Sequence, residues 1–153
     1  MLLLSAFLVG IVSGLRTFTP PAVVSWFARS GSLSVASSPL AFMGYRFTPI
    51  ILTALALFEL VMDKLPKTPS RKTPPQFIAR ILSGALTGAT IGAAGEALTA
   101  GIILGVVGAV VGTLGGAAMR ARLAAAFSRD LPAALLEDLV AIGLAIILLL
   151  RVR

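Results

Sequence analysis

Long uncharged runs alternate with short clusters of charge along the 153 residues of this chain. A helix needs about 20 mostly apolar residues to cross the ~30 Å hydrocarbon core of a bilayer. Only the run 97–119 reaches this length alone, so the other spans must include charged neighbours. The runs are 1–15, 17–28, 47–58, 81–95, 97–119 and 139–150, and the charges expected inside a bilayer are Arg16, Glu59, Asp63, Glu137 and Asp138.

Threonine–proline pairs mark three of the expected helix starts. Thr19, Thr48 and Thr73 each precede a proline, which places a capping hydroxyl before the residue that suits the first helical position. Thr73 with Gln76 also fits a capping box, and Asp130 serves the last helix in the same way. The predicted helices are 2–28 with an interruption near 14–19, 49–65, 74–95, 98–123 and 131–151.

These elements predict an all-α protein, a polytopic membrane helix bundle with about five membrane segments and an interrupted first helix. The serine-rich stretch 30–38 is expected to be an exposed loop and gives no sign of a second domain. Residues 1–153 are therefore interpreted as a single transmembrane domain.

The composition favours lipid as the solvent. Hydrophobic residues make up 58% of the chain and charged residues 12%, whereas about 25% of the residues in an ordinary soluble domain are charged. The sequence has no Cys and no His, so disulfides, thiol nucleophiles and the usual ligands of zinc, haem and iron–sulfur clusters are excluded. No metal or cofactor is expected.

The net charge of +7 does not predict nucleic-acid binding, because the cations flank apolar runs and form no single basic face. Two connectors hold most of them, and such an excess is typical of cytoplasmic loops. A five-segment arrangement puts both connectors on one side, with the N-terminus and the 64–80 loop cytoplasmic and the C-terminus outside. The cations are Lys64, Lys67, Arg71, Lys72 and Arg80 at the first connector, and Arg120, Arg122 and Arg129 at the second.

Glycines recur every four residues in the two central helices. This spacing keeps them on one helical face, where backbones can approach closely and helices can associate in lipid. The pattern predicts either a tight antiparallel hairpin or a subunit interface, and the alternative is that small residues line a permeation path. The glycines are Gly84, Gly88 and Gly92, then Gly101, Gly105, Gly108, Gly112 and Gly116.

The first apolar stretch contains a break. Pro20 and Pro21 have no backbone N–H, Pro20 disfavours helical geometry at Thr19, and Gly14 loosens the chain just before. Broken backbone within a membrane is tolerated only in protein or beside a wet cavity. A helix N-terminus there, with Arg16 beside it, indicates an anion-attracting pocket or a counter-charge for a buried carboxylate. The alternative is a kinked span whose Arg16 snorkels or forms a structural ion pair.

Two pairs of carboxylates lie at matching depths on different helices. Glu59 and Asp63 are four residues apart and share a face. Glu137 and Asp138 lie one or two turns into the last helix. Such groups can exchange protons or hold a cation, or they can simply pair with Arg80 and Arg120. Glu59 and Glu137 are the stronger functional candidates, and the predicted substrate-binding residues are Arg16, Thr17, Thr19, Glu59, Asp63, Glu137 and Asp138.

The segments 14–20 (GLRTFTP), 59–66 (ELVMDKLP) and 136–138 (LED) resemble a known family. The chain is similar over most of its length to the small bacterial integral membrane proteins called domain of unknown function 4126. This resemblance implies a multi-pass protein of the bacterial inner (cytoplasmic) membrane. It supplies no activity, so no residue role is carried over from it.

Two functions follow from these features. The first is a transporter or channel-like protein for a small solute, either anionic or a lipid phosphate, in which carboxylates couple protons or cations. The second is a non-transporting scaffold with structural ion pairs. No enzyme activity and no catalytic residue is expected, because the serines have no histidine or evident lysine base nearby. The expected partners are membrane lipids and a second copy of the chain in a homodimer, with a small solute or proton as ligand.

Overall fold

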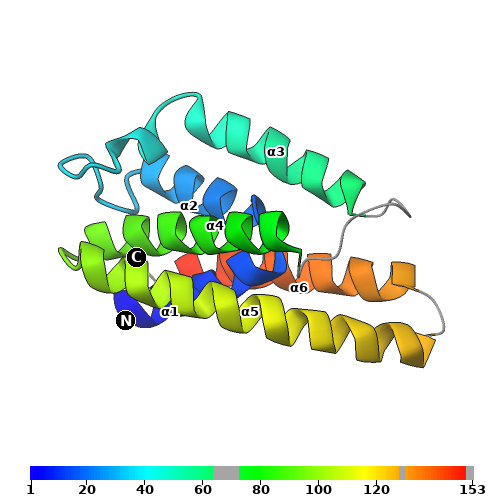
Figure 1. Ribbon diagram of the computed structural model, residues 1–153. Coiled ribbons are helices and arrows are strands. Elements are labelled where there is room, and N and C mark those ends of the chain that lie inside the picture. Colours follow the sequence, from blue (N-terminus) through cyan, green and yellow to red (C-terminus); the bar gives the residue numbers. More distant parts are fainter. Residues whose placement is uncertain (64–72, 128–129, 151–153) are drawn as a thin grey trace.

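The computed structural model describes residues 1–63, 73–127 and 130–150 (Figure 1). These residues form six α-helices and one short 3₁₀-helix, and no β-strand occurs among them. The elements are α1 Leu2–Leu15, α2 Thr19–Arg29, η1 Ala41–Gly44, α3 Thr48–Met62, α4 Pro74–Ala93, α5 Leu98–Phe127 and α6 Asp130–Leu150. The all-α fold and the break in the first helix are as the sequence predicts.

The helix starts agree with the sequence to within a residue, but of the three threonines only Thr73 occupies the predicted cap position. Thr19 and Thr48 are the first residues of their helices, behind Phe18 and Phe47, and neither helix has a side-chain cap. The Thr48 hydroxyl donates to the carbonyl of Phe42 at 2.6 Å instead. Thr73 does occupy the cap position of α4, again without a side-chain capping bond. The Asp130 side chain, predicted to cap the last helix, lies outside the described residues.

The chain reverses direction at the break. The side chain of Leu2 packs at Gly95, while the carbonyl of Leu15 accepts a hydrogen bond from Arg80, so α1 runs antiparallel to α4. Trp26 in turn donates to Thr53 at 3.0 Å, near the opposite end of α2 from the break. The first two helices therefore form a re-entrant pair and not one kinked span (Figure 1).

This reversal corrects the predicted topology. The N-terminus and the C-terminal end of α6 lie at the same end of the molecule, together with the turn between α4 and α5 (Figure 1). The ends of α3 and α4 that flank residues 64–72 lie at the opposite end. The expectation that the N-terminus and the 64–80 loop share one side is therefore wrong, because the first segment returns to the end at which it began.

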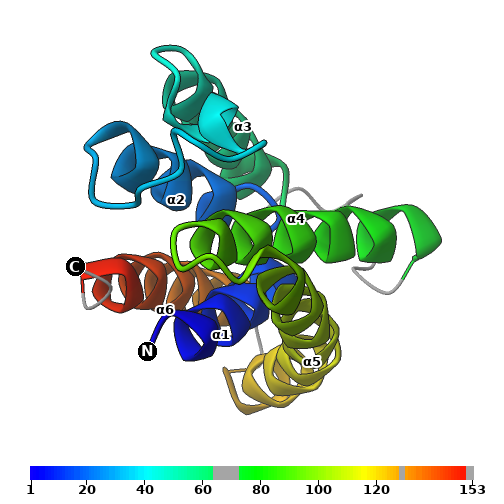
Figure 2. The same ribbon diagram turned by 90° about the vertical axis from the view of Figure 1, so that its left-hand side faces the viewer.

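Figure 2, a view down the bundle, shows α1 next to α4, α5 and α6, with α2 and α3 on the far side of α4. Glycines bring α1, α4 and α5 together. A Cβ at Gly88 or at Gly105 would lie within 3 Å of backbone atoms of the opposing helix. Gly10 of α1 likewise faces the backbone of Gly105. The predicted antiparallel hairpin is confirmed. Because these faces are filled within one chain, they are neither a subunit interface nor the wall of a path.

Buried apolar side chains join the re-entrant pair to the loop that follows it. Val9 and Val24 are fully buried beside Met43. The stretch 30–38 is mostly exposed, as predicted, but Leu33 and Val35 point inward and are 2% and 3% exposed. These residues attach the loop to the core, so it is not a free surface segment along its whole length.

Large apolar side chains also cover the outside of the molecule. On α3 only Pro49 and Ala56 are buried, and Leu57 and Phe58 are 59% and 63% exposed. Within the described part of the chain, one segment, Leu98–Leu123, is long and apolar enough to cross a membrane. Only 28% of its most apolar stretch is buried. The molecule thus presents apolar surface that its own fold does not cover.

The glycine packing gives a first prediction. Gly105→Ala places a methyl group against the backbone of Gly84 and Gly88, which cannot give way without moving α4. We expect the free energy of unfolding to fall by about 1–3 kcal/mol. Gly115→Ala is the matched control, because a Cβ there meets nothing within 4 Å. Unfolding in detergent micelles measures both variants, and equal stability of the two would contradict the close packing.

Candidate functional site

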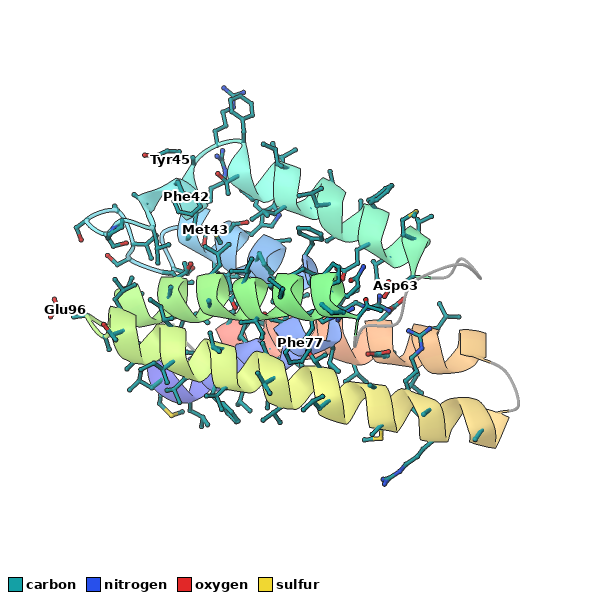
Figure 3. The ribbon with its side chains drawn as sticks, viewed as in Figure 1. Phe42, Met43, Tyr45, Asp63, Phe77 and Glu96 are labelled. Carbon is teal, nitrogen blue, oxygen red and sulfur yellow. The ribbon has the colours of Figure 1, made fainter. Side chains whose placement is uncertain are left out.

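Arg16 lies in the break between α1 and α2 and is completely buried. One guanidinium nitrogen, Nη1, donates to Asp63 at the end of α3, and the other, Nη2, donates to Asp138 of α6. Figure 3 shows Asp63 at the end of α3 and Glu96 at the far end of the bundle. Three segments that are distant in sequence therefore meet at one buried cation. The sequence left open whether Arg16 attracts an anion or is the counter-charge of buried carboxylates. In the structure it is the counter-charge of two aspartates.

The end of α1 is held by donors from two helices. Arg80 of α4 donates through Nη1 to the carbonyls of Gly14 at 3.0 Å and Leu15 at 2.6 Å. Thr113 of α5 donates to the Gly14 carbonyl at 3.3 Å. The last carbonyls of a helix lack partners within the helix and carry a partial negative charge. The buried guanidinium of Arg80 both donates hydrogen bonds to these carbonyls and places a positive charge beside them.

The start of α2 is held by a carboxylate. The two oxygens of Glu59 accept hydrogen bonds from the backbone N–H groups of Thr17, at 2.7 Å, and Phe18, at 2.9 Å. Ser83 of α4 donates to the carbonyl of Thr17 at 2.5 Å. Negative charge at a helix N-terminus is favourable. Glu59 therefore does for α2 what Arg80 does for α1.

The sequence analysis expected free N–H groups at the start of α2 that would attract an anion. In the structure a carboxylate of the protein itself occupies this place. Glu59 already takes the N–H groups of Thr17 and Phe18. Pro20 and Pro21 have none, and the N–H of Ala22 donates to Phe18 within the helix. An external anion could approach this helix end only by displacing Glu59.

Glu137 and Asp138 are neighbours in sequence with different partners. Asp138 binds Arg16, whereas Glu137 faces Arg120 of α5 at 3.7 Å. The sequence analysis left open that a carboxylate pairs with Arg120, and in the structure Glu137 forms this pair. Side-chain exposures of 9% and 10% for these carboxylates show that both are largely withdrawn from solvent.

Two buried polar atoms near the break have no hydrogen-bond partner. In the described part of the chain they include Nε of Arg16 and the hydroxyl oxygen of Thr19. Arg16 is 0% exposed and Thr19 is 4% exposed. Buried polar groups in proteins are nearly always satisfied by protein, water or ligand. The break therefore has unused hydrogen-bonding capacity.

We call the charged residues around the break the tip cluster: Arg16, Glu59, Asp63, Arg80 and Asp138. Two arginines face three carboxylates, which leaves one excess negative charge when all are ionised. Among the residues that the structure describes, no three carboxylates come together as ligands for a metal ion. The charged groups of the cluster therefore have one another and the two helix ends as partners in this structure.

The structure brings together most of the residues that the sequence singles out. Arg16, Asp63 and Asp138 touch directly, and Thr17 meets Glu59, while Thr19 is buried beside them. Sequence reasoning gave no positioning role to Arg80, Ser83 or Thr113. A signal for two of them was present, since Arg80, Ser83 and Thr87 follow the i, i+3, i+7 spacing of one helix face. The hydroxyl of Thr87 lies 3.2 Å from that of Ser13 on α1.

The fold and this cluster define a class: an all-α protein built around a buried ionic site at a broken helix. The family described as "Domain of unknown function (DUF4126)" matches residues 3–151, and the chain belongs to this family. The resemblance expected from the three sequence segments is confirmed. No curated protein and no solved structure matches the chain.

Removing Arg16 alone should cost more stability than removing all three charges of the Arg16 triad. Arg16→Met leaves Asp63 and Asp138 without the cation that pairs with both, and we expect a loss of about 3–5 kcal/mol. The triple variant Arg16→Met, Asp63→Asn, Asp138→Asn should recover most of it. Unfolding in detergent measures the series.

The exposed turn residue Glu96 provides the control, because Glu96→Gln should change stability by less than about 0.5 kcal/mol. A triple variant that is less stable than Arg16→Met would show that the three side chains do not act as one unit.

Proposed function

We propose that the protein is a multi-pass protein of the bacterial inner membrane, with four spans, α3 to α6, and a re-entrant α1–α2 pair. At ~1.5 Å per residue, the 20 residues of α4 and the 21 of α6 extend about 30 Å, the thickness of the hydrocarbon core. The exposed apolar side chains of α3 support this proposal, as does the mostly uncovered α5. Lipid would cover the surface that the fold leaves bare.

The distribution of cations supports one orientation. The two connectors whose flanking helix ends lie at one end of the bundle are rich in cations in the sequence. These are Lys64, Lys67, Arg71 and Lys72 between α3 and α4, and Arg120, Arg122 and Arg129 near the connector between α5 and α6. The positive-inside rule assigns that end to the cytoplasm. Because the first two helices form a re-entrant pair, both termini would then lie outside.

This orientation can be tested with reporter fusions. A reporter that is active only outside the cytoplasmic membrane should be active when fused after residue 153. It should be inactive when inserted between residues 67 and 70. Modification of single cysteines at positions 34 and 96 by an impermeant reagent should give the same answer, since both residues are exposed at the outer end. Labelling of position 34 only after lysis would overturn the orientation.

We further propose that the protein transports a small solute, with the tip cluster as its translocation site. The observation that carries this proposal is that Arg16, at a backbone break, binds carboxylates from two different helices. Many secondary transporters bind substrate and coupling ions at discontinuous helices near the middle of the membrane. With the connector end at the cytoplasmic surface, Arg80 lies six residues, or about 9 Å, inside α4.

The energetic cost of the cluster favours a function over a purely structural role. Each buried ion carries a desolvation penalty of several kcal/mol, and apolar residues of similar volume often give equal or greater stability. Ionisable residues inside a membrane commonly mark ion or substrate pathways. Glu59 and Arg80 bind the two helix ends at the break, whereas Arg16, Asp63 and Asp138 bind one another and add buried ions that a stable bundle would not need.

Transport can be measured in proteoliposomes with an entrapped pH indicator and an imposed phosphate gradient, and in parallel with fluorescent phosphatidic acid. We expect the parent protein to move at least one of these probes. The triple variant Arg16→Met, Asp63→Asn, Asp138→Asn should fold but move it at least tenfold more slowly, because the exchangeable charges are gone. Glu96→Gln should match the parent. Equal rates for the triple variant and the parent would refute the role of the cluster.

A second candidate is a non-transporting scaffold, and the pairing of both terminal nitrogens of Arg16 with aspartates favours it. In that case the parent protein moves neither probe. A homodimer is also proposed, since a second copy would help to enclose a path that a 153-residue bundle has little room to form alone.

A further inference from the structure

Aromatic side chains from α2 and from the segment that leads into α3 gather at one end of the bundle. The single Trp and the single Tyr of the chain, Trp26 and Tyr45, belong to this group, together with Phe42 and Phe47. All four are exposed, and Tyr45 and Phe47 reach 63%. Figure 3 shows Phe42 and Tyr45 at the same end of the bundle as Glu96. We call Trp26, Phe42, Tyr45 and Phe47 the aromatic belt.

The segment that carries three of these rings is held in one orientation. Met43 is fully buried in the core. A Cβ at Gly44 would lie 3.3 Å from the carbonyl oxygen of Ala28, so the segment packs closely on the end of α2. The hydroxyl of Thr48 donates to the carbonyl of Phe42 and closes the loop between η1 and α3. The rings are therefore exposed on a backbone that is well fixed, and packing of the core does not explain their exposure.

The charge of this surface is positive. Residues 17–58 contain two arginines, Arg29 and Arg46, and no carboxylate. Both arginines are exposed, and among the described residues neither has a carboxylate within ion-pair distance. The guanidinium of Arg46 lies 5.6 Å from the centre of the Phe47 ring, a cation–π contact. Cations among Trp and Tyr side chains match the phosphate layer of a bilayer, where such side chains are enriched.

The lengths of the helices agree with a bilayer surface at the belt. Phe47 directly precedes α3, whose exposed apolar side chains begin with Ile50. The 15 residues of α3 extend about 22 Å and end next to Asp63 of the tip cluster. In a hydrocarbon core of about 30 Å, the cluster then lies about 8 Å from the opposite surface. Arg80, counted from the start of α4, lies about 9 Å inside that surface, so two separate helices give the cluster the same depth.

We propose that the aromatic belt binds the headgroup layer of the phospholipids in the outer leaflet, and that Arg46 is the ligand of a lipid phosphate. This inference rests on the proposed membrane insertion of α3 and names the lipid contact that sets its depth. The rings lie between headgroups and acyl chains, and the guanidinium of Arg46 donates hydrogen bonds to phosphate oxygens. The belt thereby fixes the outer ends of α2 and α3, and with them the depth of the tip cluster.

Depth-dependent quenching of tryptophan fluorescence tests the position of the belt. Trp26→Phe removes the single tryptophan. Phe47→Trp, or Leu57→Trp as the matched control, then adds one at an exposed position, and ten residues of helix separate the two by about 15 Å. In phosphatidylcholine vesicles, Phe47→Trp should be quenched most by a nitroxide on the lipid headgroup. Leu57→Trp should be quenched most by a nitroxide near the end of the acyl chain, and the two depths should differ by about 15 Å.

The outcomes separate the belt from the membrane insertion of α3. Quenching of Phe47→Trp by aqueous iodide alone, with Leu57→Trp among the acyl chains, refutes the belt and leaves the insertion in place. If neither lipid labels nor iodide quench Phe47→Trp, protein such as a second copy covers this surface, and the lipid contact is overturned. Quenching of both variants by iodide alone refutes the belt and the proposed insertion together.

A lipid titration tests Arg46 as the phosphate ligand. The Phe47→Trp protein in dodecyl maltoside, a detergent without charge or phosphate, is titrated with short-chain phosphatidylglycerol, and its fluorescence reports binding at the belt. Arg46→Gln should weaken the apparent affinity about fivefold, the contribution of one basic residue at an anionic lipid surface. Arg122→Gln removes the same charge from an exposed position at the other end of the molecule and should leave the affinity unchanged. Equal affinity of the parent and Arg46→Gln, or an equal loss in both variants, would refute the assignment of Arg46.

Discussion

A backbone that breaks in an apolar environment must have each of its polar groups satisfied by another part of the protein, and this constraint governs the structure. Between Leu15 and Thr19 the chain leaves one helix and enters another that runs the opposite way. The carbonyls at the end of α1 and the N–H groups at the start of α2 have no partners within their own helices. Helices α3, α4 and α5 each supply side chains that meet them. The other helices of the bundle are thus arranged around the backbone groups that the break leaves without partners.

The signs of the charges follow from the helix dipoles. A cation, Arg80, lies at the negative end of α1, and an anion, Glu59, lies at the positive end of α2. Arg16 adds a cation that neither helix end requires, and two aspartates balance it. The structural need of the break thus accounts for Glu59 and Arg80, whereas the Arg16 triad goes beyond it. This excess is the part of the cluster that structure alone does not explain.

The sequence predicts the break and the depth of the charges because both depend on local rules. Pro20 and Pro21 fit only the first turn of a helix, so a helix that contains them must begin just before them. Counting residues along each helix gives the matching levels of the carboxylates. The direction in which the chain leaves the break depends on Glu59 and Ser83, which contact Thr17 from more than 40 residues away. The residues next to Thr17 in the sequence do not predict these distant contacts. The Thr48 cap was wrong for a similar reason, since its hydroxyl donates to the carbonyl of Phe42, which precedes the helix.

The packing around the tip cluster is uneven, because the helices that carry its residues are held to the bundle by different kinds of contact. Helices α1, α4 and α5 meet through glycines at backbone contact, so a shift of any one of them would require the others to move as well. Helix α3 packs mainly on α2 and η1 and buries only Pro49 and Ala56. It nevertheless carries Glu59 and Asp63, two of the three carboxylates of the cluster. The cluster thus joins Arg80, on a helix held by backbone contacts, to Glu59 and Asp63, which are carried by a helix that buries little of its surface.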